Sequence, residues 1–136
     1  MLRELPADDL LVVVDMEASP EHLARSTAEA VNLMLVVAEP WFRSLETARR
    51  SVTLAADLDI PKVAVVANKL RDPDDRELVE AFCARHSMEV FATLPYDDTL
   101  GDAERAGAAP VDHDADAPSV GAIDRLVDRV LALARW

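Results

Sequence analysis

Glycine and lysine are scarce in this 136-residue chain, and their scarcity excludes one class of chemistry. The three glycines, Gly101, Gly107 and Gly121, cannot form the G-x-x-x-x-G-K-[ST] loop that cradles phosphates. The two lysines, Lys62 and Lys69, lie outside any glycine-rich stretch. Phosphoryl transfer depends almost entirely on such groups, so we do not expect these residues to hydrolyse a nucleotide alone.

Cysteine and basic residues are also few. Cys83 is the single cysteine, which excludes a disulfide framework and a multi-cysteine metal site within one chain. The 26 acidic residues outnumber 14 basic ones, and the formal net charge of −12 disfavours binding to nucleic acid and to anionic membranes. The N-terminal residues do not form the unbroken apolar run of a signal peptide. We therefore expect a cytoplasmic protein with neither nucleic acid nor membrane as partner.

Four short apolar runs are the main sign of a fold. They are rich in Val and Leu and do not alternate with polar residues, which is typical of strands buried on both faces of a parallel sheet. The four runs span residues 10–14, 33–38, 63–67 and 90–94. Segments with helical spacing separate them, over residues 21–31 and 44–57 and from Asp72 onward. The second of these has an apolar stripe of Leu45, Ala48, Val52 and Ala55.

The helix that follows Asp72 has the best-defined start. Asp72 can cap it, Pro73 suits its first position, and Asp74 and Asp75 place negative charge at the positive end of the helix dipole. Its apolar stripe contains Leu78, Val79, Phe82 and Cys83.

The remainder of the chain predicts one short and one long helix. Asp98 can cap a short helix that ends at Gly107, residues 108–119 form a loop, and residues 120–136 form an amphipathic helix. The apolar face of that last helix comprises Ile123, Leu126, Val127, Val130, Leu131 and Ala134.

Alternating strands and helices predict a single α/β domain over residues 1–136, with three layers and a mainly parallel sheet of about four strands flanked by helices. If the strands add in one direction, right-handed crossovers place all connecting helices on one face. The other face then needs a cover: the C-terminal helix, a second copy of the chain, or sequence that these residues do not include.

Ligands of open parallel sheets bind outside the carboxyl ends of the strands, so the residues that end each run are candidates for the site. Asp15 ends the first run, where nucleotide hydrolases place a carboxylate that organises Mg²⁺, although by itself an aspartate that caps a strand-to-helix turn is the commoner explanation. Asn68 and Lys69 end the third run, and the asparagine amide offers a purine edge both a donor and an acceptor.

Four segments in this order resemble the second half of the deviant-Walker P-loop ATPases. They read DMEASPEHLARST (15–27), VVAEP followed by SLETA (36–48), VVANK (65–69) and LPYD (94–97). Within that family they look most like the CooC-type carbon monoxide dehydrogenase maturation factors, relatives of MinD, ParA and the nitrogenase iron proteins. The resemblance runs from about residue 9 to 131 and implies a truncated, Rossmann-like P-loop NTPase fold that matches the C-terminal half.

The resemblance also implies two sets of site residues. The first matches switch II and its Walker-B aspartate, and it comprises Asp15, Glu17, Ser19, Glu21, His22 and Arg25. The second matches the segments that bind the nucleotide base, and it comprises Asn68, Lys69, Pro95, Tyr96 and Asp97. Ser19 and Ala24 stand where the family usually has glycine, and both changes stiffen the switch.

The first half of the family pattern is missing, including the phosphate-binding loop, its lysines and a C-x-C metal pair. We therefore expect no metal and no strongly bound cofactor, with ATP and Mg²⁺ bound only if an N-terminal half completes the site. Affinity for ADP or ATP should be weaker than about 0.1 mM because the phosphate contribution is lost.

Several other residues have ordinary explanations. Cys83 lies on an apolar helix stripe and suits an inert buried thiol. His86 closes a helix, and His113 lies in an acidic segment that we expect to be a disordered loop. Trp41 and Phe42 suit either the core or a partner contact.

Two functions stay open at this point. The chain is the C-terminal portion of a CooC-like or MinD-like ATPase of the metalloenzyme-maturation class, or it is a stand-alone inactive relative that serves as an interaction or dimerisation module. Its expected partners are another copy or an N-terminal P-loop half. A GTPase is disfavoured because Asp72 comes one residue too late for N-K-x-D.

Overall fold

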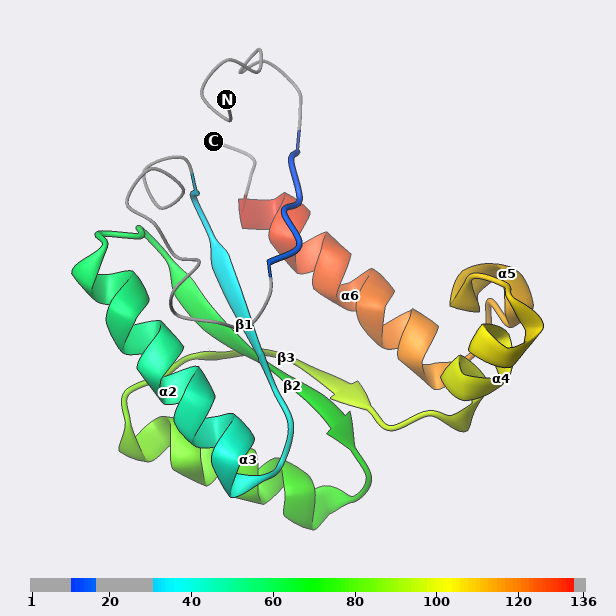
Figure 1. The fold of residues 1–136 in the computed structure, drawn as a ribbon, viewed down its shortest axis with the longest axis horizontal. Coiled ribbons are helices and arrows are strands. Elements are labelled where there is room, and N and C mark those ends of the chain that lie inside the picture. Colours follow the sequence, from blue (N-terminus) through cyan, green and yellow to red (C-terminus); the bar gives the residue numbers. More distant parts are fainter. Residues whose placement is uncertain (1–10, 17–30, 134–136) are drawn as a thin grey trace.

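The computed structural model describes residues 11–16 and 31–133. In this part of the chain, strands β1 (Met34–Ala38), β2 (Val63–Leu70) and β3 (Val90–Pro95) form one parallel sheet in the order β1-β2-β3 (Figure 1). The strands predicted from residue 33 onward are therefore confirmed, as is the α/β class. Each successive strand is also added on the same side of the sheet, which is the arrangement expected if all connecting helices lie on one face.

Helices α2 (Phe42–Asp57) and α3 (Pro73–Arg85) pack along one face of the sheet (Figure 1). Leu45, Ala48 and Ala55 of α2 are buried, which confirms the stripe read from its spacing. In α3 the Asp72 carboxylate accepts a hydrogen bond from the Asp75 N–H at 2.9 Å, so the predicted cap is confirmed.

The main core lies between these helices and the sheet. Val36, Val65 and Ala67 face it from the strands, and Val79 and Cys83 face it from α3. Cys83 is buried, and burial raises the pKa of its thiol, as an inert core cysteine requires. The α3 stripe is narrower than its sequence suggested, because Leu78 is exposed.

The opposite face is covered in part by α6 (Pro118–Leu133), which contacts β3 (Figure 1). The Arg129 guanidinium of α6 lies 4.3 Å from the Phe91 ring centroid and donates a hydrogen bond to the Phe91 carbonyl. The C-terminal helix is thus one cover of the second face. Its predicted apolar face is used only partly, since Ile123, Val127 and Leu131 remain exposed.

The predicted first strand is wrong for the residues that the structure describes. Residues 11–14 form no strand and their side chains are exposed. An apolar run becomes a buried parallel strand only where a neighbouring strand satisfies its backbone, and β1 pairs with β2 alone within the described ranges. The predicted helix over residues 21–31 lies outside the described residues except for Val31, which is not helical.

The segment after β3 also differs from its prediction in three places. Asp97 caps α4 (Asp98–Ala106), whereas the sequence suggested Asp98. The predicted loop over 108–119 contains α5 (Pro110–His113) and the first two residues of α6. Proline at the first position of both helices explains why they form, because its fixed φ suits helix starts. Gly107, with φ of 65°, ends α4 as predicted.

Two further properties follow from the described helices and side chains. None of these helices combines the length and apolarity that a membrane crossing requires. Residues 11–16 and 31–133 also contain no cluster of three or more His, Cys, Asp or Glu side chains placed to hold a metal ion. His113 belongs to α5, and His86 follows α3, where its ring centroid lies 4.6 Å from that of Phe82.

Candidate functional site

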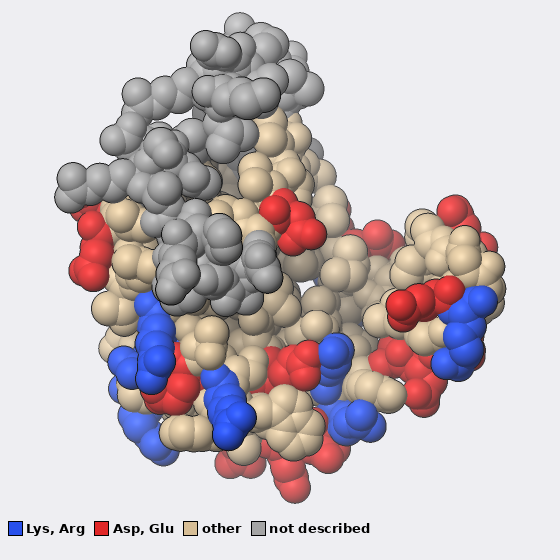
Figure 2. Space-filling model, viewed as in Figure 1, with Lys and Arg blue, Asp and Glu red and all other residues tan. Residues whose placement is uncertain are grey.

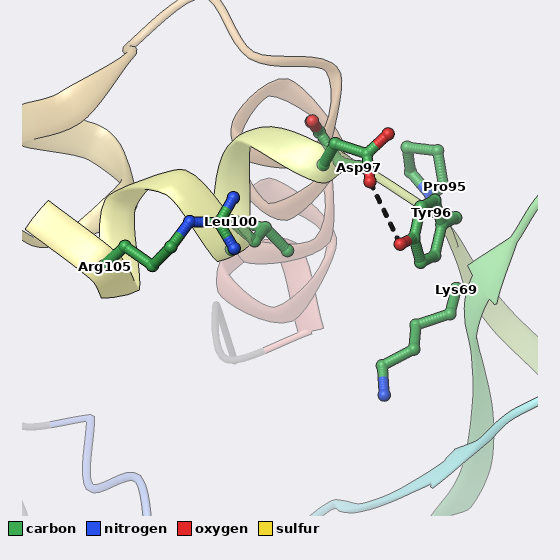
Figure 3. A pocket seen from close by; sticks show the side chains of 8 residues that line it. Lys69, Pro95, Tyr96, Asp97, Leu100 and Arg105 are labelled. Atoms are coloured by element: carbon green, nitrogen blue, oxygen red, sulfur yellow. Dashed lines mark hydrogen bonds between the residues drawn. The ribbon is translucent and has the colours of Figure 1, made fainter.

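An open cavity of about 250 Å³ lies where β2 and β3 end and α4 begins (Figure 3). Its lining residues are Lys69, Pro95, Tyr96, Asp97, Asp98, Leu100, Gly101 and Arg105. Four of these belong to the set of five that the sequence assigned to nucleotide binding. The fifth, Asn68, directly precedes Lys69 in the chain but is not one of the lining residues.

The end of β2 is distorted where it meets the cavity. Lys69 has a φ of 57°, in the left-handed region that non-glycine residues rarely adopt, and the pairing with β3 shifts between Ala67 and Leu70. The Lys69 N–H donates to the Asn68 side-chain oxygen at 3.0 Å, which holds that amide in place. Backbone strain of this kind concentrates at functional sites.

Lys69 crosses toward the end of the neighbouring strand. Its Nζ lies 2.6 Å from the Glu39 carboxylate, and the Glu39 N–H donates to the Ser44 hydroxyl at 2.9 Å. The pair joins the carboxyl ends of β1 and β2 beside the cavity. Because both side chains are partly exposed, we attribute to the pair a role in orientation and little stability.

The end of β3 supplies the aromatic part of the site. The Tyr96 N–H donates to the Leu70 carbonyl at 2.8 Å, which continues the pairing with β2 past the strand end. The Tyr96 hydroxyl donates to the Asp98 carboxylate at 3.0 Å (Figure 3), and the Arg71 guanidinium lies 3.7 Å from the ring centroid. These contacts fix a flat aromatic side chain at the mouth of the cavity.

Asp97 anchors the site. One of its oxygens accepts from the Thr99 N–H at 3.0 Å and from the Thr99 hydroxyl at 2.6 Å, and the other accepts from the Ser119 N–H at 3.0 Å. The hydrogen bond from the Thr99 hydroxyl, with that from the Ser119 N–H, lowers the pKa of Asp97 to about 2. The carboxylate therefore ties the start of α4 to the start of α6.

The part of the cavity that α4 lines was not predicted from the sequence. Leu100, Gly101 and Arg105 line the cavity from this helix (Figure 3). Arg105 pairs with Asp102 one turn away. A glycine inside a helix was the available signal, because glycine is unfavourable there unless something else requires it. Nothing in the sequence could show that this helix faces Lys69.

The charges of the cavity are already satisfied by neighbours. Lys69 pairs with Glu39, Arg105 pairs with Asp102, and the two aspartates accept the hydrogen bonds described above. What remains free is an apolar and aromatic slot formed by Pro95, Tyr96, Leu100 and Gly101. Such a slot suits a flat, neutral ring with hydrogen-bonding edges.

The other predicted site residues are not gathered at this cavity. Asp15 is exposed and does not line it. The remaining residues of the predicted switch set, Glu17, Ser19, Glu21, His22 and Arg25, lie outside the described residues. Trp41 and Phe42 are 58% and 75% exposed at the start of α2, so the core interpretation of this pair is wrong.

Comparison with known proteins finds relatives that cover most of this chain. It is 40% identical over 99 residues to an uncharacterised ATP-binding protein of Methanocaldococcus jannaschii, an overlap of 73% of this chain and 38% of that protein. It is 38% identical over 101 residues to the carbon monoxide dehydrogenase accessory protein CooC of Rhodospirillum rubrum, covering 74% of this chain and 38% of CooC. No model of a protein family matches the chain.

The fold has a counterpart among solved structures. The MinD cell division protein of Aquifex aeolicus superimposes with a TM-score of 0.66 at 22% identity, over 77% of this chain and 46% of MinD. The chain thus spans about two fifths of the length of the curated relatives it matches, and the matched part is their C-terminal part. The fold around the cavity is that of the matching part of MinD.

Proposed function

Because this chain is a partial member of the CooC and MinD family of ATPases, we propose that it is the part of a nucleotide-dependent ATPase that binds the base. One observation carries the proposal: Lys69, Pro95, Tyr96 and Asp97, assigned to the nucleotide from sequence, line a single cavity at the carboxyl end of the sheet. Asn68 stands beside them, with its amide held by the Lys69 N–H.

The phosphates and Mg²⁺ require groups from elsewhere. These 136 residues contain no phosphate-binding loop motif. The two cationic side chains of the cavity, Lys69 and Arg105, form ion pairs with Glu39 and Asp102. An N-terminal half with that loop, in the same protein or in another chain, would complete the site and supply most of the stabilisation of phosphoryl transfer. Asp15 would then serve as the Walker-B aspartate.

The biological role that this relationship supports is nucleotide-coupled maturation of a metalloenzyme. CooC is named as an accessory protein of carbon monoxide dehydrogenase, and it is 38% identical to this chain in the shared part. We propose the same class of role here, with ATP hydrolysis only after the phosphate-binding half is present.

The test is a titration of the ¹⁵N-labelled chain with ADP, followed by amide chemical shifts. We expect shifts concentrated at Lys69, Tyr96 and Leu100, with a dissociation constant weaker than about 0.1 mM because the phosphate contribution is missing. Tyr96→Ala should abolish these shifts, whereas Arg76→Ala, which breaks an exposed pair with Glu80 on α3, should leave them unchanged. Shifts scattered away from the cavity, or micromolar affinity with Mg²⁺, would contradict the proposal.

A second candidate function is a protein-interaction or dimerisation module that does not use nucleotide. Trp41 and Phe42 favour it, because two adjacent large aromatic side chains are mostly exposed and Trp is enriched among residues that dominate binding energy at interfaces. Light scattering decides between the two: concentration-dependent association that Trp41→Ala abolishes, in a chain whose amides do not respond to ADP, would favour the module.

A further inference from the structure

We propose that α4 is the second wall of the base pocket and that Gly101 lets the flat face of a purine lie directly against the backbone of this helix. The inference rests on the proposed function and names the residues that give the pocket its shape. Lys69 and Tyr96 form one side of the cavity, and Leu100, Gly101 and Arg105 form the other (Figure 3).

Nothing within the fold explains a glycine at position 101. It lies inside a nine-residue helix, where glycine is the least favourable residue after proline. Its φ is not positive, unlike that of Gly107, so its backbone is open to any residue. An added Cβ would sit 3.6 Å from the nearest atom, Nη1 of Arg105, which is ordinary van der Waals contact. The remaining feature of Gly101 is the cavity that it lines.

The size and charge of the cavity indicate what would lie against this glycine. A volume of about 250 Å³ is below the range of roughly 300–1,000 Å³ for sites that enclose a drug-sized ligand. The positive charges of Lys69 and Arg105 are balanced by the acidic side chains with which they pair, so the interior of the cavity does not favour an anionic ligand. These properties fit the purine ring of a nucleotide inside, with its phosphates outside the cavity.

Gly121 provides a matched control. It also lies inside a helix, and an added Cβ would also sit 3.6 Å from Nη1 of the arginine four residues later, Arg125. It does not line the cavity. Gly101→Ala and Gly121→Ala should therefore affect the fold alike and the pocket differently.

The experiment compares wild type, Gly101→Ala and Gly121→Ala in thermal unfolding and in amide-shift titrations with adenosine and ADP. Both variants should unfold about 3–5 °C higher than wild type because alanine is the better helix residue. Gly101→Ala should weaken binding of adenosine and of ADP by about tenfold, since the methyl group occupies the face of the ring. Gly121→Ala should bind as wild type does.

The possible outcomes separate the two proposals. If wild type binds ADP at the cavity and Gly101→Ala binds equally well, the inference about α4 fails while the proposed function stands. If wild type shows no shifts at Lys69 and Tyr96, both fail. If Gly101→Ala does not fold, Leu100→Ala replaces it: several-fold weaker adenosine binding would support the wall, and unchanged binding would overturn it.

Discussion

The two outer strands of the sheet, β1 and β3, differ in how much of the described structure packs around them. Beyond β3, the helices α4 and α6 are joined by the Asp97 carboxylate, and Phe91 is buried beneath Arg129. Beyond β1, no further strand pairs within the described part of the chain, and Val37 is 60% exposed. The difference teaches that, among the described residues, the β3 side of the sheet is held by contacts between its own elements, whereas the β1 side leaves an apolar side chain in solvent.

The largest expected effect tests the two faces of β1. Leu45→Ala, in the core between α2 and β1, should lower the free energy of unfolding by about 3 kcal/mol through lost burial and a cavity. Val37→Ala on the other face should cost less than about 0.5 kcal/mol, because its side chain is mostly in solvent. Urea unfolding measures both values. Equal losses would mean that something covers Val37 in solution.

Self-association is the next test of the exposed side. No strand pairs with the outer edge of β1 among residues 11–16 and 31–133, and Val37 is exposed, so two copies should associate there and Val37→Lys should weaken that association by about tenfold or more. Leu78→Lys, which changes an exposed apolar residue on α3, is the control and should have no such effect. Light scattering over a concentration series measures it. A monomer at every concentration would exclude β1 as a self-association edge.

A smaller effect is expected at the strained end of β2. Lys69→Gly should stabilise the fold by up to about 1 kcal/mol by relieving the left-handed φ, less the small contribution of the exposed pair with Glu39. It should weaken ADP binding because the pocket loses a wall. Asp59→Gly relieves the same φ of 57° away from the cavity and should leave the ADP shifts unchanged. A Lys69→Gly chain that binds normally would show that the strain serves no ligand.

The smallest expected effect is on the melting temperature at acidic pH, through Asp97 on the β3 side of the sheet. Asp97 has a folded-state pKa of about 2, below its ordinary 3.8, so its contribution is present above pH 4 and is lost as pH falls toward 2. The melting temperature of wild type should exceed that of Asp97→Asn by a few degrees near neutral pH, and the two should converge near pH 2. Melting curves across this range measure it, and a constant difference would contradict it.

The sequence predicted the elements that local chemistry specifies. The Asp72-Pro73 start of α3, the α2 stripe and the three strands from residue 33 onward were readable because capping, periodicity and apolar runs are local signals. The strand expected at residues 10–14 was wrong, since an apolar run indicates burial and cannot show whether a neighbouring strand is available. The buried part of the apolar face of α6 was overestimated for the same reason.

The candidate site was predicted in part. Lys69, Pro95, Tyr96 and Asp97 were found because the ends of parallel strands meet at one edge and because their order matched a family pattern. Leu100, Gly101 and Arg105 were missed because the face that α4 turns to the cavity is set by tertiary packing, of which the Asp97 tie to Ser119, a contact across 22 positions, is one part. No periodicity in the sequence encodes that tie.

The order of the sheet has a consequence for how the molecule assembles. Strands that are neighbours in the sheet are successive in the chain, so each pairing closes through one helix and its turns. Each pairing costs less chain entropy than one between strands far apart in the chain would, because the entropy of loop closure grows with the number of residues enclosed. All residues that line the cavity come from the end of β2 onward, so the pairing of β2 with β3 and the packing of α4 bring them together without a residue from β1.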